Sequence, residues 1–401
     1  MGRSVPALPR DANSRVLGLS TGHFVSFDSS FSHVLHYVPR PVSFDPNLPY
    51  NDLPLLPPAG ELETRQILKK CVAAHRALAE LKGTGDLIPN QSMLINAIPL
   101  QEAKLSSEIE NIVTTQDALF QAALDESRAT DPATKEVLRY RAALRHGFES
   151  LQNEPFRITL LEELCGILRD EHVEFRTDGG VYVGNPSART ITYTPPEGAA
   201  IMRTKLGNLE DFLLATDELD PLVRMAVAHY QFEAIHPFTD GNGRTGRILN
   251  ILFLLHAGLL HLPVLYLSRH LIQHKGEYYR LLRAVTEGGQ WEEWVLFMLT
   301  GVEETAAWTT GRILAIRDLF DETLARCRAK LPAKVYSKEL VELVFTEPYC
   351  KIQFLVEAGI AKRQTASEYL QELEKLGILT AEKKGREVMY KHPALLKLLT
   401  A

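Results

Sequence analysis

A charged, glycine-rich segment of twelve residues, 236–247, separates two apolar stretches in the middle of the chain. Apolar residues at helical spacing predict a helix over 222–235 before this segment and another that begins near Thr245. Gly241 and Gly243 lie in the joining segment, where glycine allows a tight turn and close approach of the backbone to a ligand. We therefore expect two helices joined by a loop that runs into a helix N-terminus.

Length and composition narrow the class of protein. A chain of 401 residues predicts roughly two to three domains, and 45% hydrophobic with 23% charged residues is typical of a globular protein. The net charge of −6 argues against dependence on bulk electrostatic attraction to nucleic acid. The four cysteines form no C-x-x-C pair, and the start of the chain lacks a signal-peptide pattern, so we expect a cytoplasmic protein.

The apolar segment 248–267 raises the question of a membrane span. It contains Asn250, His256 and Pro263, and Gly258 ends the helical pattern after about three turns. A spanning helix needs about 20 apolar residues without such interruptions. The segment therefore predicts a buried core helix, and we expect no membrane partner.

Composition divides the chain into four predicted regions. Residues 1–60 are rich in proline and predict an extended arm, and residues 61–130 predict an N-terminal helical region. Residues 131–330 predict a mostly helical core, and 331–401 a C-terminal domain. Helices are expected over 118–124, 134–151, 158–169, 206–214, 222–235, 291–299 and 313–330. One β-hairpin is expected over 181–194, so the predicted fold class is mostly α.

The residue types in the joining segment indicate chemistry on phosphates. A helix N-terminus attracts anions, and Arg244 and Arg247, three residues apart, can face the same anion. Asp240 offers an oxygen ligand for Mg²⁺, and His236 can take a proton near neutral pH. These groups together predict phosphoryl or nucleotidyl transfer. The alternative, a glycine-rich helix cap with solvent-facing charges, does not account for so many specific residue types.

This segment does not fit either of two common phosphate-binding motifs. Residues 241–246 satisfy G-x-G-x-x-G, but a helix precedes them, and no acidic residue ends a second strand about 20 positions later. The same residues have Walker spacing, but Arg247-Ile248 stands where Lys-Ser/Thr is required. We expect neither a dinucleotide-binding fold nor a P-loop.

Residues 236–247 read HPFTDGNGRTGR and resemble the signature of the Fic family, H-P-F-x-[D/E]-G-N-G-R-x-x-R, without departure. The similarity extends from about residue 53 to the C-terminus and is to the bacterial AMP–protein transferases that have an N-terminal inhibitory helix. The resemblance implies an all-helical Fic core with a hairpin flap over 131–330. It also implies transfer of AMP from ATP, with Mg²⁺, to a Ser, Thr or Tyr hydroxyl of a target protein or of the enzyme itself, releasing pyrophosphate. Some family members transfer UMP or phosphocholine, and others remove AMP, so these activities are alternatives for this chain. A homodimer is common among such relatives.

The resemblance also implies roles for individual residues. His236 would deprotonate the target hydroxyl, Phe238 would anchor the loop in the core, and Asp240 would hold Mg²⁺ on the phosphates. The implied nucleotide-binding residues of the signature are Gly241, Asn242, Gly243, Arg244, Thr245, Gly246 and Arg247. Tyr278 and Tyr279 resemble the aromatic pair that borders the adenine pocket, although ordinary core packing explains them equally well.

A second segment resembles the inhibitory pattern of the same family, [S/T]-x-x-x-E-[G/N]. Ser106, Glu110 and Asn111 fill its positions. The resemblance implies that Glu110 pairs with Arg247 and occupies the place of the ATP γ-phosphate. The alternative is a helix capping box formed by Ser107 and Glu110.

The predicted hairpin would be the flap of the family, with Thr190, Ile191, Thr192 and Tyr193 beside the target peptide. Backbone pairing with that peptide would position its hydroxyl group. An ordinary surface hairpin is the alternative.

The last seventy residues predict a winged helix-turn-helix domain. Helices are expected over 337–345, 349–357 and 364–376, and strands over 378–381 and 388–390. A DNA-binding regulator is therefore an alternative function for the protein. Residues 336–401 contain ten lysines and arginines against nine acidic residues, which is a small excess for binding a phosphate backbone. Docking of a protein partner is the favoured interpretation, and DNA contact the weaker one.

Overall fold

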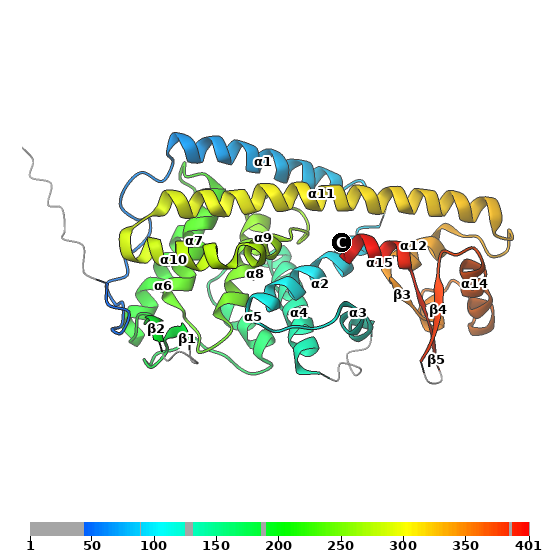
Figure 1. Cartoon of the computed structure of the whole chain (residues 1–401), viewed down its shortest axis with the longest axis horizontal. Helices are drawn as coiled ribbons and strands as arrows, with labels where there is room; N and C mark the ends of the chain where they lie inside the picture. Colours follow the sequence, from blue (N-terminus) through cyan, green and yellow to red (C-terminus); the bar gives the residue numbers. More distant parts are fainter. Residues whose placement is uncertain (1–43, 89, 125–130, 186–189, 385–386, 401) are drawn as a thin grey trace, which may run out of the picture. The chain divides into compact units, whose positions relative to one another are not determined.

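The computed structural model describes residues 44–88, 90–124, 131–185, 190–384 and 387–400 (Figure 1). The fold is mostly α, as predicted. The helices are α1 Arg65–Gly85, α2 Ser92–Ile109, α3 Gln116–Leu124, α4 Pro132–Asn153, α5 Leu160–Arg169, α6 Ala199–Leu214, α7 Pro221–Ile235, α8 Asn242–His256, α9 Leu267–Gln273, α10 Lys275–Gly288, α11 Trp291–Lys330, α12 Lys338–Thr346, α13 Ile352–Glu357, α14 Arg363–Lys375 and α15 Pro393–Thr400. The strands are β1 Val183–Asn185, β2 Thr190–Tyr193, β3 Tyr349–Cys350, β4 Thr380–Lys384 and β5 Glu387–Lys391.

Helix α11 is the long element along which α1 packs (Figure 1). The sequence predicted two separate helices here, 291–299 and 313–330, but the structure has one helix of 40 residues. The intervening residues continue the buried face with Val302, Ala306 and Thr309, so nothing interrupts the helix. Acidic residues in its first turn and basic residues in its last turn also stabilise α11, because their charges interact favourably with the helix dipole.

Helices α7 and α8 form the centre of the fold and are buried on nearly all sides. Helix α7 begins at Pro221, and the Asp220 side chain caps it by accepting from the Leu222 N–H at 2.8 Å. Helix α8 ends at His256, just before Gly258 with φ +68°, as the sequence predicted. Helices α4, α5 and α7 pack around α8, so the signature segment between α7 and α8 is fixed on a rigid core.

Helix α2 overturns the capping-box interpretation of Ser107 and Glu110. Ser107 lies inside α2, and Glu110 is the residue that ends the helix. A capping box requires the serine at the N-terminus of a helix, whereas these two residues lie in the last turn.

The predicted hairpin is present as β1 paired antiparallel with β2, with Gly184 opposite Ile191. The sequence predicts a Gly-Asn-Pro-Ser turn at residues 184–187, but Gly184 and Asn185 belong to β1, and residues 186–187 fall outside the described residues. The extended arm is described from residue 44, and residues 1–43 fall outside the described part. Helix α6 holds the arm, because the Asn208 amide bonds both backbone groups of Leu56 and Lys205 Nζ donates to the Leu53 carbonyl at 2.5 Å.

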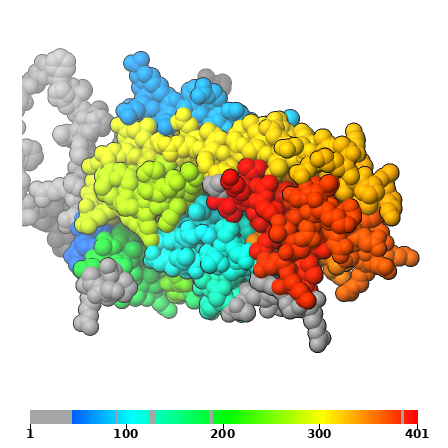
Figure 2. Space-filling view, turned by 45° about the vertical axis from the view of Figure 1, so that its right-hand side comes forward, coloured from blue at the N-terminus to red at the C-terminus, as the bar shows by residue number. Residues whose placement is uncertain are grey.

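The C-terminal part contains the expected short helices and strand pair, with one correction. The sequence predicted a helix over 349–357, but Tyr349 and Cys350 form β3, and the helix begins at Ile352. Strand β3 pairs with β5, so the sheet has three strands in the order β3-β5-β4. Helices α12 and α15 pack against α2, and Figure 2 shows the red C-terminal residues against the cyan surface.

Among the described residues, no helix combines the length and the apolar character needed to cross a membrane. The boundaries of the four predicted regions stay a prediction.

Candidate active site

Residues 236–241 connect α7 to α8 through two left-handed positions. His236 ends α7 with φ +50°, and Gly241 precedes α8 with φ +85°. Helix α8 begins at Asn242, three residues earlier than predicted. The Asn242 side chain closes the loop, because its oxygen accepts from the Phe238 N–H at 2.9 Å and its nitrogen donates to the Phe238 carbonyl at 2.8 Å. The loop is therefore held by its own side chains in one conformation.

Phe238 anchors this loop in the core, as expected. Its side chain is fully buried and stacks on Phe175 with ring centroids 5.4 Å apart. Burial of an aromatic side chain contributes about 2–3 kcal/mol, so the loop position is strongly favoured.

Arg176 is a buried residue that the sequence did not single out. Its guanidinium donates to four backbone carbonyls, those of Ile235, His236, Pro196 and Asp178, at 2.6–3.2 Å. The cation lies at the C-terminus of α7, where the helix dipole favours positive charge. Arg176 therefore joins the signature loop to the segment that follows β2. No sequence signal identifies it, because its partners lie up to 60 residues away.

The His236 imidazole is arranged to accept a proton. Its Nδ1 lies 3.3 Å from the Glu233 carbonyl oxygen, so Nδ1 carries the proton and Nε2 is the acceptor. Burial lowers the pKa of His236 to about 4, and this effect outweighs the hydrogen bond to Glu233, which raises it. The ring is therefore neutral at pH 7, which is the form that a general base requires.

The first turn of α8 is occupied by a carboxylate from α2. Backbone N–H groups of a first helical turn lack partners within the helix and attract anions. A Cβ atom at Gly243 would lie 2.5 Å from Oε1 of Glu110, so the Glu110 carboxylate lies directly against this turn. Only glycine at 243 leaves room for that approach.

Glu110 forms an ion pair with Arg247, as expected. The distance from Arg247 Nη2 to Glu110 Oε1 is 2.9 Å, and the arginine side chain is only 2% exposed. Ser106 binds the same guanidinium through its hydroxyl at 2.7 Å and its carbonyl at 3.1 Å. Asn111 reverses the chain with φ +62° and accepts from Lys275 at 3.3 Å. The structure thus brings two of the three residues of the predicted inhibitory pattern, Ser106 and Glu110, to the second signature arginine, whereas Asn111 contacts Lys275.

Two acids near Arg247, the buried Glu102 and the partly buried Glu233, were not predicted. Glu102 of α2 is 1% exposed and accepts from the Ser268 N–H at 3.1 Å and from the Ser268 hydroxyl. Burial raises the pKa of Glu102 and of Glu233 to about 7, although the Arg247 charge opposes this in both. No sequence pattern marks these two acids, because only the fold brings α2, α7 and α8 together around Arg247.

The first signature arginine, Arg244, has a different set of partners. Its Nη1 lies 2.8 Å from Glu136 Oε2 of α4, and its Nη2 lies 3.7 Å from Asp240 Oδ2. Arg244 is buried, whereas the Asp240 side chain is 68% exposed. Glu136 was not among the predicted site residues, because it stands 108 positions before its partner.

The donors around the loop suit Mg²⁺ that arrives with phosphates. Within the described parts of the chain, no group of three or more His, Cys, Asp or Glu side chains is placed to hold a metal ion. Asp240, whose side chain is 68% exposed, is the signature carboxylate beside the α8 N-terminus, whereas the Glu110 carboxylate at the same helix end is paired with Arg247. Mg²⁺ is commonly bound by one or two carboxylates together with phosphates and water, so a single aspartate fits that role.

The remaining predicted nucleotide-binding residues differ in exposure. Tyr278 is buried and its hydroxyl lies 3.0 Å from His229 Nε2, whereas Tyr279 is 42% exposed. Tyr278 therefore belongs to the core, and Tyr279 offers a ring to a ligand. Thr245 is buried, and Gly246 permits close packing, since a Cβ there would lie 2.7 Å from Glu233 Oε1.

The predicted flap residues divide in the same way. Thr190, Ile191 and Thr192 are exposed. Tyr193 is turned inward, and its hydroxyl donates to the Ala234 carbonyl at 2.7 Å. This bond fixes the flap to the end of α7, next to His236.

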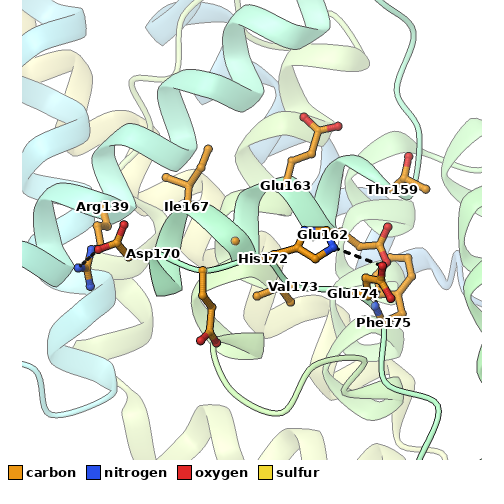
Figure 3. A pocket seen from close by; sticks show the side chains of 12 residues that line it. Arg139, Thr159, Glu162, Glu163, Ile167, Asp170, His172, Val173, Glu174 and Phe175 are labelled. Atoms are coloured by element: carbon orange, nitrogen blue, oxygen red, sulfur yellow. Dashed lines mark hydrogen bonds and ion pairs between the residues drawn. The ribbon is translucent and has the colours of Figure 1, made fainter.

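A surface cavity of about 810 Å³ lies beside α5 and the segment that follows it (Figure 3). It reaches Phe175, the residue that stacks on Phe238, but it contains no signature residue. Its lining includes the carboxylates of Glu162, Glu163, Asp170, Glu171 and Glu174. So many acidic groups would repel a triphosphate, so this cavity is not the expected nucleotide site.

Comparison with known proteins finds similarity to Fic proteins in two parts of the chain. A family model for the Fic/DOC family N-terminal domain matches residues 68–149, and one for the C-terminal domain of SoFic-like protein adenylyltransferases matches residues 319–395. The protein adenylyltransferase Fic of Culex quinquefasciatus is 31% identical over 192 residues, which cover 45% of this chain and 34% of the relative. The protein adenylyltransferase fic-1 of Caenorhabditis elegans is 36% identical over 110 residues, 27% of this chain and 19% of the relative.

The chain thus spans between a fifth and a third of the length of these curated relatives. Among solved structures, a Fic family protein from Desulfovibrio desulfuricans shares the fold, with a TM-score of 0.51 and 19% identity. That similarity covers 82% of this chain and 96% of the other. The two domain matches and the curated relatives show that this chain is similar to Fic-family protein adenylyltransferases, and the solved structure shows that the two chains share a fold.

Proposed function

We propose that this protein transfers AMP from ATP to hydroxyl groups of serine, threonine or tyrosine in target proteins and in itself, releasing pyrophosphate. The observation that carries the proposal is the neutral His236 imidazole beside a helix N-terminus that bears two buried arginines. The relatives named protein adenylyltransferases support the choice of AMP.

The α8 N-terminus would bind the phosphates of ATP. The N–H groups of its first turn at Asn242 and Gly243, which have no partner within the helix, together with Arg244 and Arg247, would supply fixed positive charge once Glu110 is displaced. Asp240 would hold Mg²⁺, which neutralises negative charge on the phosphates when it is bound. The exposed ring of Tyr279 would border the adenine.

His236 would act as the general base. Its Nε2 would take the proton of the target hydroxyl while the hydroxyl oxygen forms a bond to the α-phosphorus. The bond from the α-phosphorus to the bridging oxygen then breaks, and pyrophosphate leaves with the electron pair. The exposed residues of β2 would hold the target peptide, and Tyr193 and Arg176 fix this strand relative to His236.

Glu110 would restrain the enzyme. Its carboxylate occupies the anion position over Gly243 and neutralises Arg247. A γ-phosphate in that position would meet a like charge, so ATP would bind poorly or in an unreactive orientation. Displacement of Glu110 would release both the arginine and the helix N-terminus.

The experiment that tests the proposal is a labelling assay of the purified full chain. The protein and its Glu110→Gly variant are incubated with Mg²⁺ and with α-³²P-labelled ATP, CTP, GTP or UTP. We expect label on protein from ATP, and none from γ-³²P-labelled ATP, because AMP rather than phosphate is transferred. Label from another nucleotide would change the assigned substrate, and loss of label from premodified protein would reveal removal of AMP. Absence of label from all four nucleotides in Glu110→Gly would contradict the proposed activity.

A further inference from the structure

Both signature arginines are paired with carboxylates from the N-terminal helices, but the two pairs differ. Glu110 approaches Arg247 across the position proposed for a phosphate, over Gly243. Glu136 binds Arg244 from α4, on a helix that also packs against α8. The Fic signature contains no counterpart of Glu136, so the second pair needs its own explanation.

The Arg244 guanidinium forms a close ion pair through Nη1, whereas its Nη2 and Nε have weaker or no partners among the described residues. Glu136 Oε2 accepts from Nη1 at 2.8 Å, while Nη2 lies 3.7 Å from Asp240. Nε is buried and has no hydrogen-bond partner within the described residues. A guanidinium has five N–H donors in a fixed plane, so fixing one edge orients the others. Donors therefore remain for an anion at the α8 N-terminus.

We propose that Glu136 is a positioning residue that holds Arg244 in the orientation required to bind the phosphates of ATP. This inference rests on the proposed function. Glu136 lies on α4, a helix of 22 residues that packs against α8, and its side chain is 32% exposed, so the fold places its backbone beside Arg244 and the ion pair orients both side chains. A preorganised donor binds an anion without the cost of ordering a free side chain. Glu136 and Glu110 thus have opposite effects, since the first prepares an arginine and the second blocks one.

The inference predicts different results for two substitutions. Glu136→Ala removes the acceptor, so Arg244 can rotate, and binding of ATP should weaken. Glu136→Gln removes the charge but keeps an oxygen that can accept from Nη1, so it should largely preserve the orientation. A carboxylate that merely competed with phosphate would give the reverse pattern, with tighter binding of ATP in both variants.

The test is made in the full-length Glu110→Gly protein, in which the restraint from α2 is removed. The KM for ATP and kcat of automodification are measured, and the Kd for ATP is measured by calorimetry with His236→Ala added to prevent turnover. For Glu136→Ala we expect about a tenfold increase in KM and Kd, the effect of losing one oriented charge-assisted hydrogen bond, with kcat within about threefold. For Glu136→Gln we expect both values within about threefold of the parent.

Glu149→Ala is the matched control, because Glu149 lies on the same helix in an exposed ion pair with Arg145. It should leave the KM and Kd unchanged, and circular dichroism should show that every variant is folded. Unchanged or tighter ATP binding in Glu136→Ala, or equal weakening in both Glu136 variants, would overturn the inference. The calorimetric Kd distinguishes these outcomes even when no protein is labelled, a result that would instead contradict the proposed transfer activity.

Discussion

The two arginines of the signature segment and two exposed ion pairs of the C-terminal part use charge in opposite ways, although Lys391 in the C-terminal part does pair with the distant Asp117. In the signature segment, Arg247 and Arg244 are buried and pair with acids 137 and 108 positions away. In the C-terminal part, the pairs Lys338–Glu342 and Lys375–Glu372 join residues three or four positions apart, with both lysines exposed.

This difference has an energetic meaning. Burying a charge is costly unless the charge is paired and hydrogen-bonded, so buried ionic groups that are gathered from distant elements indicate a functional site. Exposed local pairs contribute about 0–1 kcal/mol and indicate little about function. Substitutions in the first region should therefore change activity strongly, and substitutions in the second should change it little.

The largest effect is expected for His236→Ala. Loss of the general base should reduce transfer by about 10²–10⁴-fold. The Kd for ATP should change little, because other residues bind the phosphates. Labelling and calorimetry on the same preparation measure both quantities. Transfer at the parental rate by a folded His236→Ala protein would remove this histidine from the mechanism.

The next largest effect is expected for Glu110→Gly. Removal of the carboxylate should release Arg247, so automodification should increase at least about tenfold and ATP should bind more tightly. Adding Arg247→Ala should abolish the gain, because the released arginine is what produces it. If labelling of Glu110→Gly stays at the level of the parent protein, the chain keeps its proposed activity but loses its proposed restraint.

The pH dependence of transfer tests the buried state of His236. Because burial lowers its pKa to about 4, the ring should stay unprotonated, and the base active, until the pH falls toward that value. A histidine with the ordinary pKa of about 6.5 would lose about tenfold in rate between pH 7.5 and 5.5. We expect a loss of less than about twofold over that range from this group. The rate of Glu110→Gly labelling is measured across the range, with and without Glu102→Gln and Glu233→Gln, because those two acids have raised pKa values of about 7. An acid limb near pH 6.5 that persists without both acids would contradict the assignment.

The smallest effect is expected for Lys375→Ala in the C-terminal part. Its exposed ion pair with Glu372 should change the free energy of unfolding by less than about 0.5 kcal/mol, with no change in labelling of the Glu110→Gly protein. Denaturant titration measures the first quantity. A clear loss of transfer would show that the two regions are functionally coupled. It would contradict the expectation that exposed local ion pairs have little effect on activity.

For the C-terminal part, unlike the signature segment, the sequence predicts secondary structure but not function. Its helices and strands were largely predictable, but β3 was taken for helix, because two residues pair with β5 only in the folded chain. Whether this part docks a protein or binds DNA stays a prediction. The element order supplies no chemistry that would decide it.

The sequence by itself determined the helical fold, the position of the loop and the identity of its reactive residues. Periodicity specified helices such as α7 and α8, since an apolar face at helical spacing has few other ways to be buried. The HPFTDGNGRTGR segment specified His236 and the two arginines, because their types and spacing are local properties of the chain.

Only the tertiary structure decided which groups surround those residues. Arg176 binds the loop, Glu136 pairs with Arg244, and Glu102 lies near Arg247, all from positions that are distant in the sequence, and no local pattern marks them. The pKa of His236 also depends on burial by several elements, which one segment cannot specify. The physical reason is that desolvation and ion pairing depend on distances in space, and these are set only when the helices pack.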